Sequence, residues 1–171
     1  ETYDRFFNAL GDSASGAIIS SSADIIDSDD NLTGNLPPER AVWQESDRAS
    51  ELESVVGAPV YRVEVKELLR RCLKHMKSPF MFASTCYPRK LYEEVEGYGG
   101  NRVINPDKWF SWKLMGVAET AYFIDRPLFS YRVHQSNQNS LQASAGALKF
   151  MVDEYLATLE VDPKWLEKKG H

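Results

Sequence analysis

The sequence has little cysteine and no long apolar run. Its two cysteines, Cys72 and Cys86, lack CxxC spacing, so neither a disulfide framework nor a cysteine metal site is predicted. Both lie in apolar surroundings, which favours buried free thiols. No apolar run approaches the roughly 20 residues that span a bilayer. No signal peptide is visible at the start of the chain.

An excess of positive charge is also missing. The formal net charge is −5, which disfavours a nucleic-acid partner. With 43% hydrophobic and 26% charged residues, the 171-residue chain has the composition of a globular domain with a real core. Together with the cysteine usage, these features favour a cytoplasmic location.

Hydrophobic periodicity and turn residues predict an α/β layered domain, because helical and strand patterns alternate along the chain. The predicted elements are a helix over 3–10, a strand over 17–27, a long loop over 31–60 with one helical turn at 50–56, a helix over 65–76, a buried strand over 79–83, helices over 88–94 and 107–115 (the latter closed by Gly116), two short strands over 119–125 and 128–133, and a last helix over 148–159. The basic side chains of the 65–76 helix are interpreted as a solvated face.

The most informative motifs lie between residues 79 and 140. They are Tyr87-Pro88-Arg89-Lys90, Gly97-Tyr98-Gly99-Gly100, Asn105-Pro106-Asp107 at the start of a helix, and Tyr131-Arg132-Val133-His134. This order resembles family 2 glycosyltransferases of the GT-A type, and the resemblance extends over about residues 1–140. It implies that 1–140 is the C-terminal, acceptor-side part of a GT-A domain with a mixed sheet, and 141–171 a helical extension.

The chain opens inside a helical pattern and without methionine. The resemblance implies that a nucleotide-binding half precedes Glu1 and is absent from this chain. We therefore expect the chain alone to be inactive in sugar transfer.

Asp107 is the candidate catalytic base. Inverting glycosyl transfer needs a group that takes the proton from the attacking acceptor hydroxyl. The resemblance assigns this role to Asp107, and a helix N-terminus favours a negative charge there. The family often has two adjacent acids at this point, whereas this sequence has Pro106-Asp107. The alternative interpretation is a plain helix-capping aspartate.

The leaving nucleoside diphosphate needs positive charge beside it. The resemblance implies a divalent cation, Mn²⁺ or Mg²⁺, held by an Asp-x-Asp motif that this chain lacks. Asp27, Asp29 and Asp30 follow the wrong strand and are interpreted as a solvated turn. Arg132 and His134 are the candidate contacts to the diphosphate or metal, with a structural hydrogen bond as the alternative for His134.

Four residues are candidates for binding the acceptor: Tyr98, Gly99, Gly100 and Trp109. Glycines let a ligand approach the backbone closely, and an aromatic ring can stack on a sugar, although core packing is the alternative for Trp109. The partners that the resemblance implies are a nucleotide-sugar donor and a sugar, lipid-linked or protein acceptor in polysaccharide or glycoconjugate synthesis. Peripheral association with the inner face of the membrane fits such acceptors.

Three other functions stay open on the sequence alone. The first is a non-catalytic carbohydrate- or partner-binding remnant of the same fold. The second is a hydrolase with paired carboxylates such as Glu96 and Asp107, which glycoside hydrolysis would need roughly 5–10 Å apart. The third is a purely structural α/β domain.

Overall fold

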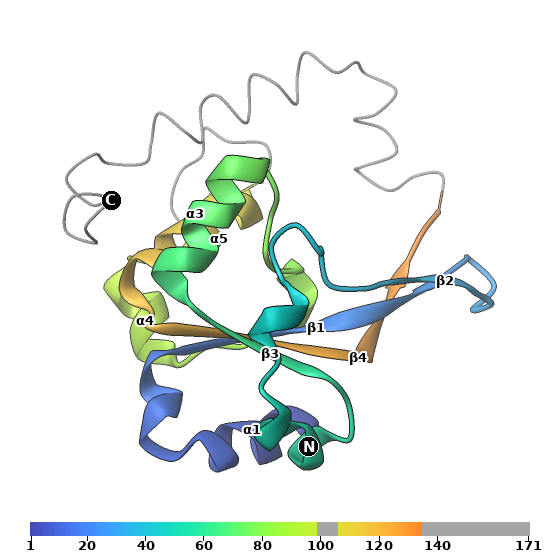
Figure 1. The fold of residues 1–171 in the computed structure, drawn as a ribbon. Helices are drawn as coiled ribbons and strands as arrows, with labels where there is room; N and C mark the ends of the chain where they lie inside the picture. The colour runs from blue at the N-terminus through green and yellow to red at the C-terminus, as the bar shows by residue number, and fades with distance from the viewer. Residues whose placement is uncertain (99–105, 135–171) are drawn as a thin grey trace.

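A computed structural model describes residues 1–98 and 106–134 of the chain. Its helices and strands are α1 (Thr2–Leu10), β1 (Ala17–Ile26), β2 (Leu32–Leu36), α2 (Ser50–Val56), β3 (Val60–Glu64), α3 (Val65–His75), α4 (Arg89–Glu94), α5 (Pro106–Val117) and β4 (Thr120–Arg132), as drawn in Figure 1. Short 3₁₀ turns cover Gly11–Gly16, Glu45–Asp47 and Phe82–Ser84. The helix expected over 148–159 lies outside the described residues.

The four strands form one mixed sheet in the order β2-β1-β4-β3. The central strands β1 and β4 are parallel, and each edge strand is antiparallel to its neighbour. A parallel pair needs a long crossover, which here contains β2, α2, β3, α3, α4 and α5. The prediction of an α/β domain with a mixed sheet is therefore confirmed.

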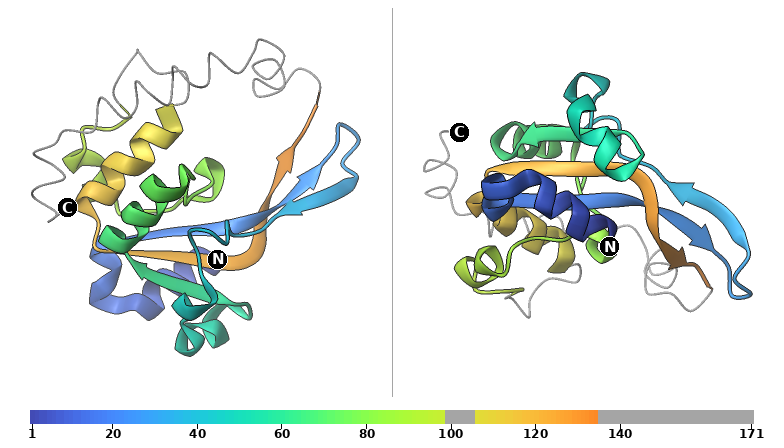
Figure 2. Two further views of the ribbon diagram at one scale, coloured as in Figure 1. Left: turned by 45° about the horizontal axis from the view of Figure 1, so that its top comes forward. Right: turned by 90° about the horizontal axis from the view of Figure 1, so that it is seen from below.

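Helices cover both faces of the sheet (Figures 1 and 2). On one face, α3, α4 and α5 pack over Ile18, Ala121 and Phe123. On the other, α1 and α2 pack over Ile19 and Tyr122. Successive strand residues point to opposite faces, so strands covered on both sides are buried at every position, as the first seven residues of β1 are.

Two strands were missed by the prediction of a long loop over 31–60, while α2 was predicted correctly. β2 is an exposed edge strand centred on Gly34, and it lacks the apolar alternation that would reveal it. β3 alternates, but it runs directly into α3 without an intervening turn, which hides the boundary. The helix periodicity that follows at residue 65 therefore dominated the sequence pattern.

The buried strand predicted over 79–83 is wrong, because this segment ends in the Phe82–Ser84 turn. The Thr85 hydroxyl donates to the Met81 carbonyl oxygen at 2.6 Å, and the Ser84 amide also donates to it, at 3.1 Å. Such local bonds from hydroxyl side chains compete with a strand ladder. Pairing resumes only at Cys86, whose amide and carbonyl both bond to Ile19.

The two short strands expected around Arg126-Pro127 are one long strand with a bend. The parallel register to β1 shifts between Ser21, opposite Ile124, and Ser22, opposite Pro127. Proline lacks the amide that a ladder needs, so it sits where the pairing is interrupted. Figure 1 shows the bend, beyond which β4 follows the β1–β2 hairpin outward.

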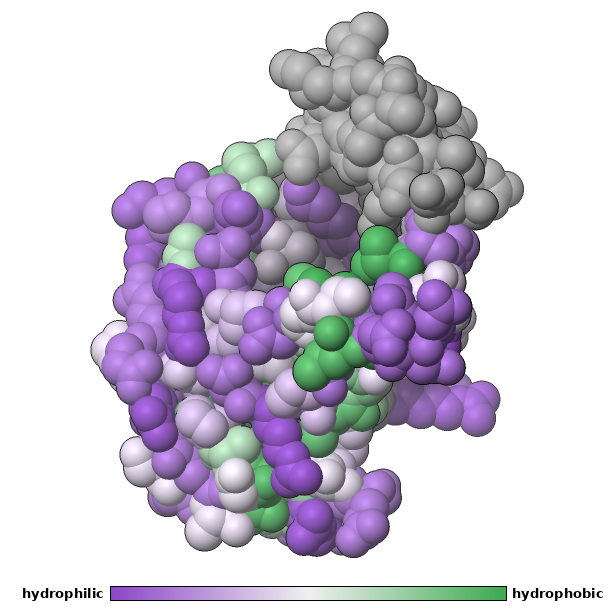
Figure 3. Space-filling model, turned by 90° about the vertical axis from the view of Figure 1, so that its right-hand side faces the viewer, coloured by the Kyte–Doolittle hydropathy of each residue, from purple (hydrophilic) through white to green (hydrophobic). Residues whose placement is uncertain are grey.

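The side of the molecule from which the hairpin projects carries only small hydrophobic areas among hydrophilic side chains (Figure 3). Leu32 and Val133, at the ends of these strands, are exposed to 67% and 42%. The other described elements follow the prediction closely. α1 ends at Gly11, α3 has the expected apolar stripe, and Pro88 precedes α4 as its N-cap. α5 continues through Gly116 to Val117 instead of ending there.

Candidate functional site

Asp107 lies in the first turn of α5 with an exposed side chain. Its carbonyl oxygen accepts a hydrogen bond from the Ser111 hydroxyl at 2.8 Å, within the first turns of the helix. The free amides and dipole of a helix N-terminus favour an anion at this position. The carboxylate is thus open to solvent and to an incoming molecule, as a proton acceptor requires.

Tyr98 is the predicted site residue that the structure brings next to Asp107. Its ring stacks on Phe110 of α5, with the centroids 4.1 Å apart and the planes 18° from parallel. Burial raises the pKa of Tyr98 above the ordinary tyrosine value, and the nearby Tyr87 and the charge of Asp107 add to the rise. The carboxylate of Asp107 and the phenol of Tyr98 therefore lie within electrostatic range of each other.

The phenol oxygen of Tyr98 is buried, and it has no hydrogen-bond partner within residues 1–98 and 106–134. A buried hydroxyl without a partner costs about 1–3 kcal/mol. Such a group marks a position where an additional polar atom, from a water molecule or a ligand, could supply the missing hydrogen bond.

The turn that carries Tyr98 is tied to α5 and α4. Gly97 has φ +68°, and a Cβ there would lie 2.8 Å from the Tyr92 hydroxyl oxygen, so glycine is required. Lys113 of α5 donates to the Gly97 carbonyl oxygen at 3.0 Å. Gly99 and Gly100, predicted to contact the acceptor, lie outside the described residues.

Aromatic residues form the floor of the site around Phe110. Tyr87, Tyr92 and Tyr98 all have ring centroids within 6 Å of it. Trp109, predicted to bind the acceptor, is half-buried and packs against the main core, as the alternative interpretation expected. Trp112 is buried in that core, and the Lys108 ammonium lies 5.6 Å from its ring centroid.

Arg132 is engaged with the acidic turn between β1 and β2. It donates to the carbonyl oxygens of Asp27 and Ser28 at 2.7 and 3.2 Å and forms an ion pair with Asp30. Asp27 accepts bonds from the backbone and side chain of Asn31, which lower its pKa. The prediction of an exposed turn over these aspartates is confirmed.

His134 follows β4 and is exposed. The amide of the preceding Val133 donates to Ile26, so the backbone here still follows β1. Figures 1 and 2 place this end of β4 beside the hairpin and apart from α5. The structure thus brings Asp107 and Tyr98 together but does not place Arg132 or His134 in contact with them.

A divalent cation finds no ready site in the described residues, where no group of three or more His, Cys, Asp or Glu side chains could hold one. His134 offers one imidazole, and the donors of the acidic turn already bind Asn31 and Arg132. The described residues therefore supply no ligand set for the cation that the resemblance implies, and no catalytic step is derived through it.

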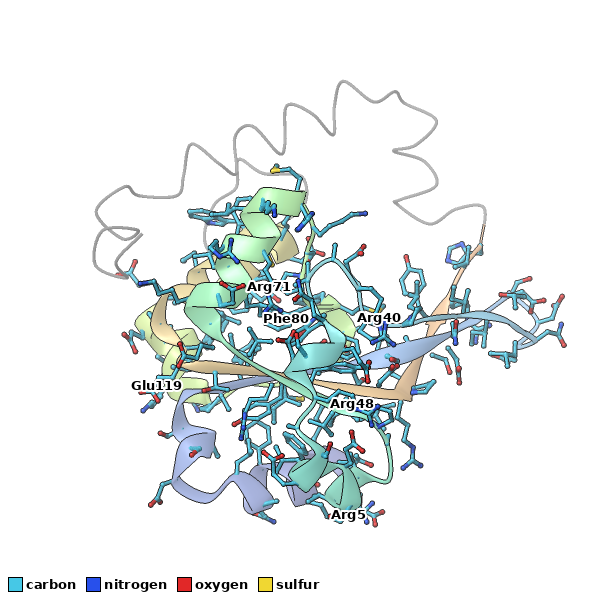
Figure 4. All side chains as sticks on the ribbon, in the orientation of Figure 1. Arg5, Arg40, Arg48, Arg71, Phe80 and Glu119 are labelled. Atoms are coloured by element: carbon cyan, nitrogen blue, oxygen red, sulfur yellow. The ribbon has the colours of Figure 1, made fainter. Side chains whose placement is uncertain are left out.

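A polar chain at the bend of β4 was missed by sequence reasoning. Ser22 donates to Asp125 at 2.8 Å, Arg40 bonds to the same carboxylate at 3.0 Å, and its other nitrogen lies 2.5 Å from the Tyr61 hydroxyl. Figure 4 shows Arg40 beside the bend. The partners are up to 103 residues apart in the chain, so no local pattern reveals them.

Arg71 was predicted to lie on a solvated face but is buried. It forms a bidentate ion pair with Asp47 at 2.5 and 3.1 Å, pairs with Glu67 and donates to the Val42 carbonyl oxygen at 2.9 Å. Its hydrogen bond to Asp47 is the main cause of its raised pKa. Figure 4 shows Arg71, a residue of the middle of α3, and its pair with Asp47 fastens the segment before α2 to the helix.

Both cysteines are free thiols. Cys72 is buried, and desolvation raises its pKa to about 12, so it is inert as a nucleophile. Cys86 is only half-buried, and its pKa is also raised by burial. The prediction of buried thiols is confirmed for Cys72 and holds in part for Cys86.

Comparison with protein-family models and with curated proteins finds no match for this chain. In the part of the chain that the structure describes, no helix is long and apolar enough to cross a membrane.

Proposed function

We propose that this chain forms the acceptor side of a GT-A glycosyltransferase resembling family 2, with Asp107 as the base. The observation that carries the proposal is the exposed carboxylate at the start of α5, within electrostatic range of Tyr98, whose ring stacks on Phe110 of the same helix. The mixed α/β sheet agrees with the expected architecture.

The reaction is a displacement at the anomeric carbon of the donor sugar. The acceptor oxygen forms a bond to this carbon as the bond to the diphosphate oxygen breaks, and the electron pair leaves with the nucleoside diphosphate. The hydroxyl proton moves to a carboxylate oxygen of Asp107. Attack from the side opposite the leaving group inverts the configuration, and a positioned base contributes about 10²–10⁴-fold to the rate.

Arg132 and His134 take different parts in this proposal. Arg132 uses its guanidinium to hold the acidic turn, so it fixes the end of the hairpin. His134, exposed two residues further on, is the side chain left to contact the diphosphate of a nucleotide-sugar donor.

The test uses the product of the complete open reading frame. Release of nucleoside diphosphate is measured with a panel of UDP-, GDP- and dTDP-sugars, with and without Mn²⁺ or Mg²⁺. Asp107→Asn is expected to lower kcat by about 10²–10⁴-fold with little change in the KM for the donor. The matched control is Asp4→Asn, which changes the first-turn aspartate of α1, a helix on the opposite face of the sheet.

Turnover that is unchanged in Asp107→Asn would remove the catalytic role. Binding of donor or saccharide by the wild type without any turnover would instead support the carbohydrate-binding remnant. A hydrolase would release free sugar from a glycoside without any nucleotide, which a separate assay of reducing sugar detects.

A further inference from the structure

Phe82 is an exposed aromatic ring, although the residues two positions before and after it are buried. Its relative exposure is 56%, whereas Phe80 and Ser84 are exposed to only 7% and 3%. Fully burying a phenylalanine side chain is favourable by about 1.5–3 kcal/mol, so this ring loses a large part of that stabilisation in the unliganded chain.

The backbone holds this ring firmly in place. Ser84, two residues on, hydrogen-bonds through its hydroxyl to Ser20 at 2.8 Å and accepts from the Ser21 amide at 3.2 Å. Tyr3 of α1 donates to the Ser84 carbonyl oxygen at 2.6 Å. The turn is therefore anchored to the central strand β1, and Phe82 pays little ordering entropy when a ligand binds.

Tyr98 links the exposed ring to α5. Phe82 meets Tyr98 edge to face, with centroids 5.3 Å apart and planes at 84°. Tyr98 in turn stacks on Phe110, and the charge of Asp107 acts on its phenol. Phe82 is thus one ring contact away from the helix that carries the exposed Asp107 carboxylate.

We propose that Phe82 is the stacking platform for the pyranose ring of the acceptor, an inference that rests on the proposed function. One face of a pyranose presents C–H groups, which suit the electron-rich face of an aromatic ring. Its hydroxyl groups lie around the rim, where the exposed Asp107 carboxylate at the start of α5 can accept the proton of one. A sugar suits a single exposed ring better than an acyl chain or an apolar helix, because either of these would need a larger apolar patch.

The inference is tested on this chain by saturation-transfer NMR, with irradiation of aromatic protons. The probes are methyl β-D-glucopyranoside, methyl β-D-galactopyranoside and N-acetylglucosamine, with open-chain sorbitol as the control for hydroxyl content. Phe82→Ala is expected to weaken pyranose binding about tenfold, and Phe82→Tyr to keep it. Leu32→Ala is the matched control, because it removes an exposed apolar side chain at the distant hairpin.

A tenfold loss confined to Phe82→Ala, with axial C–H protons receiving most of the saturation, supports the platform. Equal binding by wild type and Phe82→Ala, no pyranose signal in the wild type, or an equal signal from sorbitol would overturn it. Thermal unfolding of each variant checks that the fold is kept.

Failure of the platform is distinguishable from failure of the catalytic proposal. In the complete gene product, Phe82→Ala should raise the acceptor KM about tenfold and leave kcat nearly unchanged, whereas Asp107→Asn lowers kcat. If pyranose binding depends on Phe82 but Asp107→Asn turns over normally, the stacking role of Phe82 is supported and the catalytic role of Asp107 is contradicted. If Asp107→Asn loses much of its kcat but Phe82→Ala has an unchanged acceptor KM, the catalytic role is supported and the stacking role is contradicted.

Discussion

Tyr98 and Phe110 lie face to face with ring centroids 4.1 Å apart. This contact joins the glycine turn after α4 to α5, the helix that carries Asp107 in its first turn. The two candidate residues come from different elements, so their proximity depends on this stack.

Replacing Tyr98 with phenylalanine keeps the stack and removes the buried hydroxyl that has no partner among the described residues. We expect the free energy of unfolding to stay the same or rise by about 1 kcal/mol. Tyr98→Ala removes the ring as well and should cost about 3 kcal/mol. Urea denaturation measures both, and a clear loss of stability in Tyr98→Phe would show that the phenol is hydrogen-bonded in the folded chain.

Substitutions of Arg71 and Asp47 should have strongly non-additive effects on the free energy of unfolding. Both side chains are about 10% exposed, so Asp47→Ala should leave the buried guanidinium with Glu67 as its remaining carboxylate partner and cost about 3 kcal/mol. The double variant Arg71→Met with Asp47→Leu removes both charges and should cost about 1 kcal/mol, because the Val42 carbonyl loses its donor. A double-mutant cycle from urea denaturation checks this, and additive losses would contradict a coupled pair.

Stability at alkaline pH should depend on Tyr3. Burial raises the pKa of Tyr3 to about 12 from an ordinary 10.0, which disfavours the phenolate in the folded state. The stabilisation linked to the neutral phenol is therefore complete below pH 10 and is lost as the pH rises from 10 to 12, amounting to about 2 kcal/mol. Unfolding midpoints in urea across this range should fall less steeply in Tyr3→Phe than in the wild type; parallel curves would contradict the linkage.

Arg132→Gln should loosen the acidic turn with only a small change in global stability. The guanidinium and its partner Asp30 are exposed, so the loss is about 1 kcal/mol or less. Amide hydrogen exchange at Asp29 and Asn31, whose amides bond to Asp27, should accelerate several-fold. Arg89→Gln is the control, since it breaks only an exposed pair with Glu93 in α4 and should leave the turn unchanged.

His134→Ala separates the two parts assigned at the end of β4. In the complete gene product it should lower turnover of nucleotide sugars while leaving exchange in the acidic turn unchanged. Arg132→Gln should act mainly on the acidic turn, where it should accelerate amide hydrogen exchange. A turnover loss in Arg132→Gln that matches the His134→Ala loss, without a change in exchange, would assign the guanidinium to the diphosphate instead.

The local patterns of the sequence predicted much of the secondary structure. The apolar spacing of residues 65–76 gave α3 because its stripe follows the helical period, and Gly11 marked the end of α1. β1 was found from its β-branched residues and the acidic turn that follows. These features depend on neighbours in the chain, so a local reading suffices.

Features that depend on distant partners could not be read in this way. β2 is a strand because it borders β1, and Arg71 is buried because Asp47 lies 24 residues away in the chain but beside it in space. Phe82 was expected inside a buried strand, yet hydrogen bonds from Ser84 to β1 turn the segment and leave the ring exposed. The bend of β4 similarly follows from its register against β1.

The sequence by itself determined that the chain is an α/β domain with a carboxylate at a helix start, since helix and strand periods and an aspartate after proline are properties of short segments. Only the tertiary structure decided which side chains accompany that carboxylate. It placed Tyr98 and Phe82 beside α5 and sent Arg132 to the acidic turn, because burial and hydrogen bonding across the sheet select partners that sequence separation does not encode.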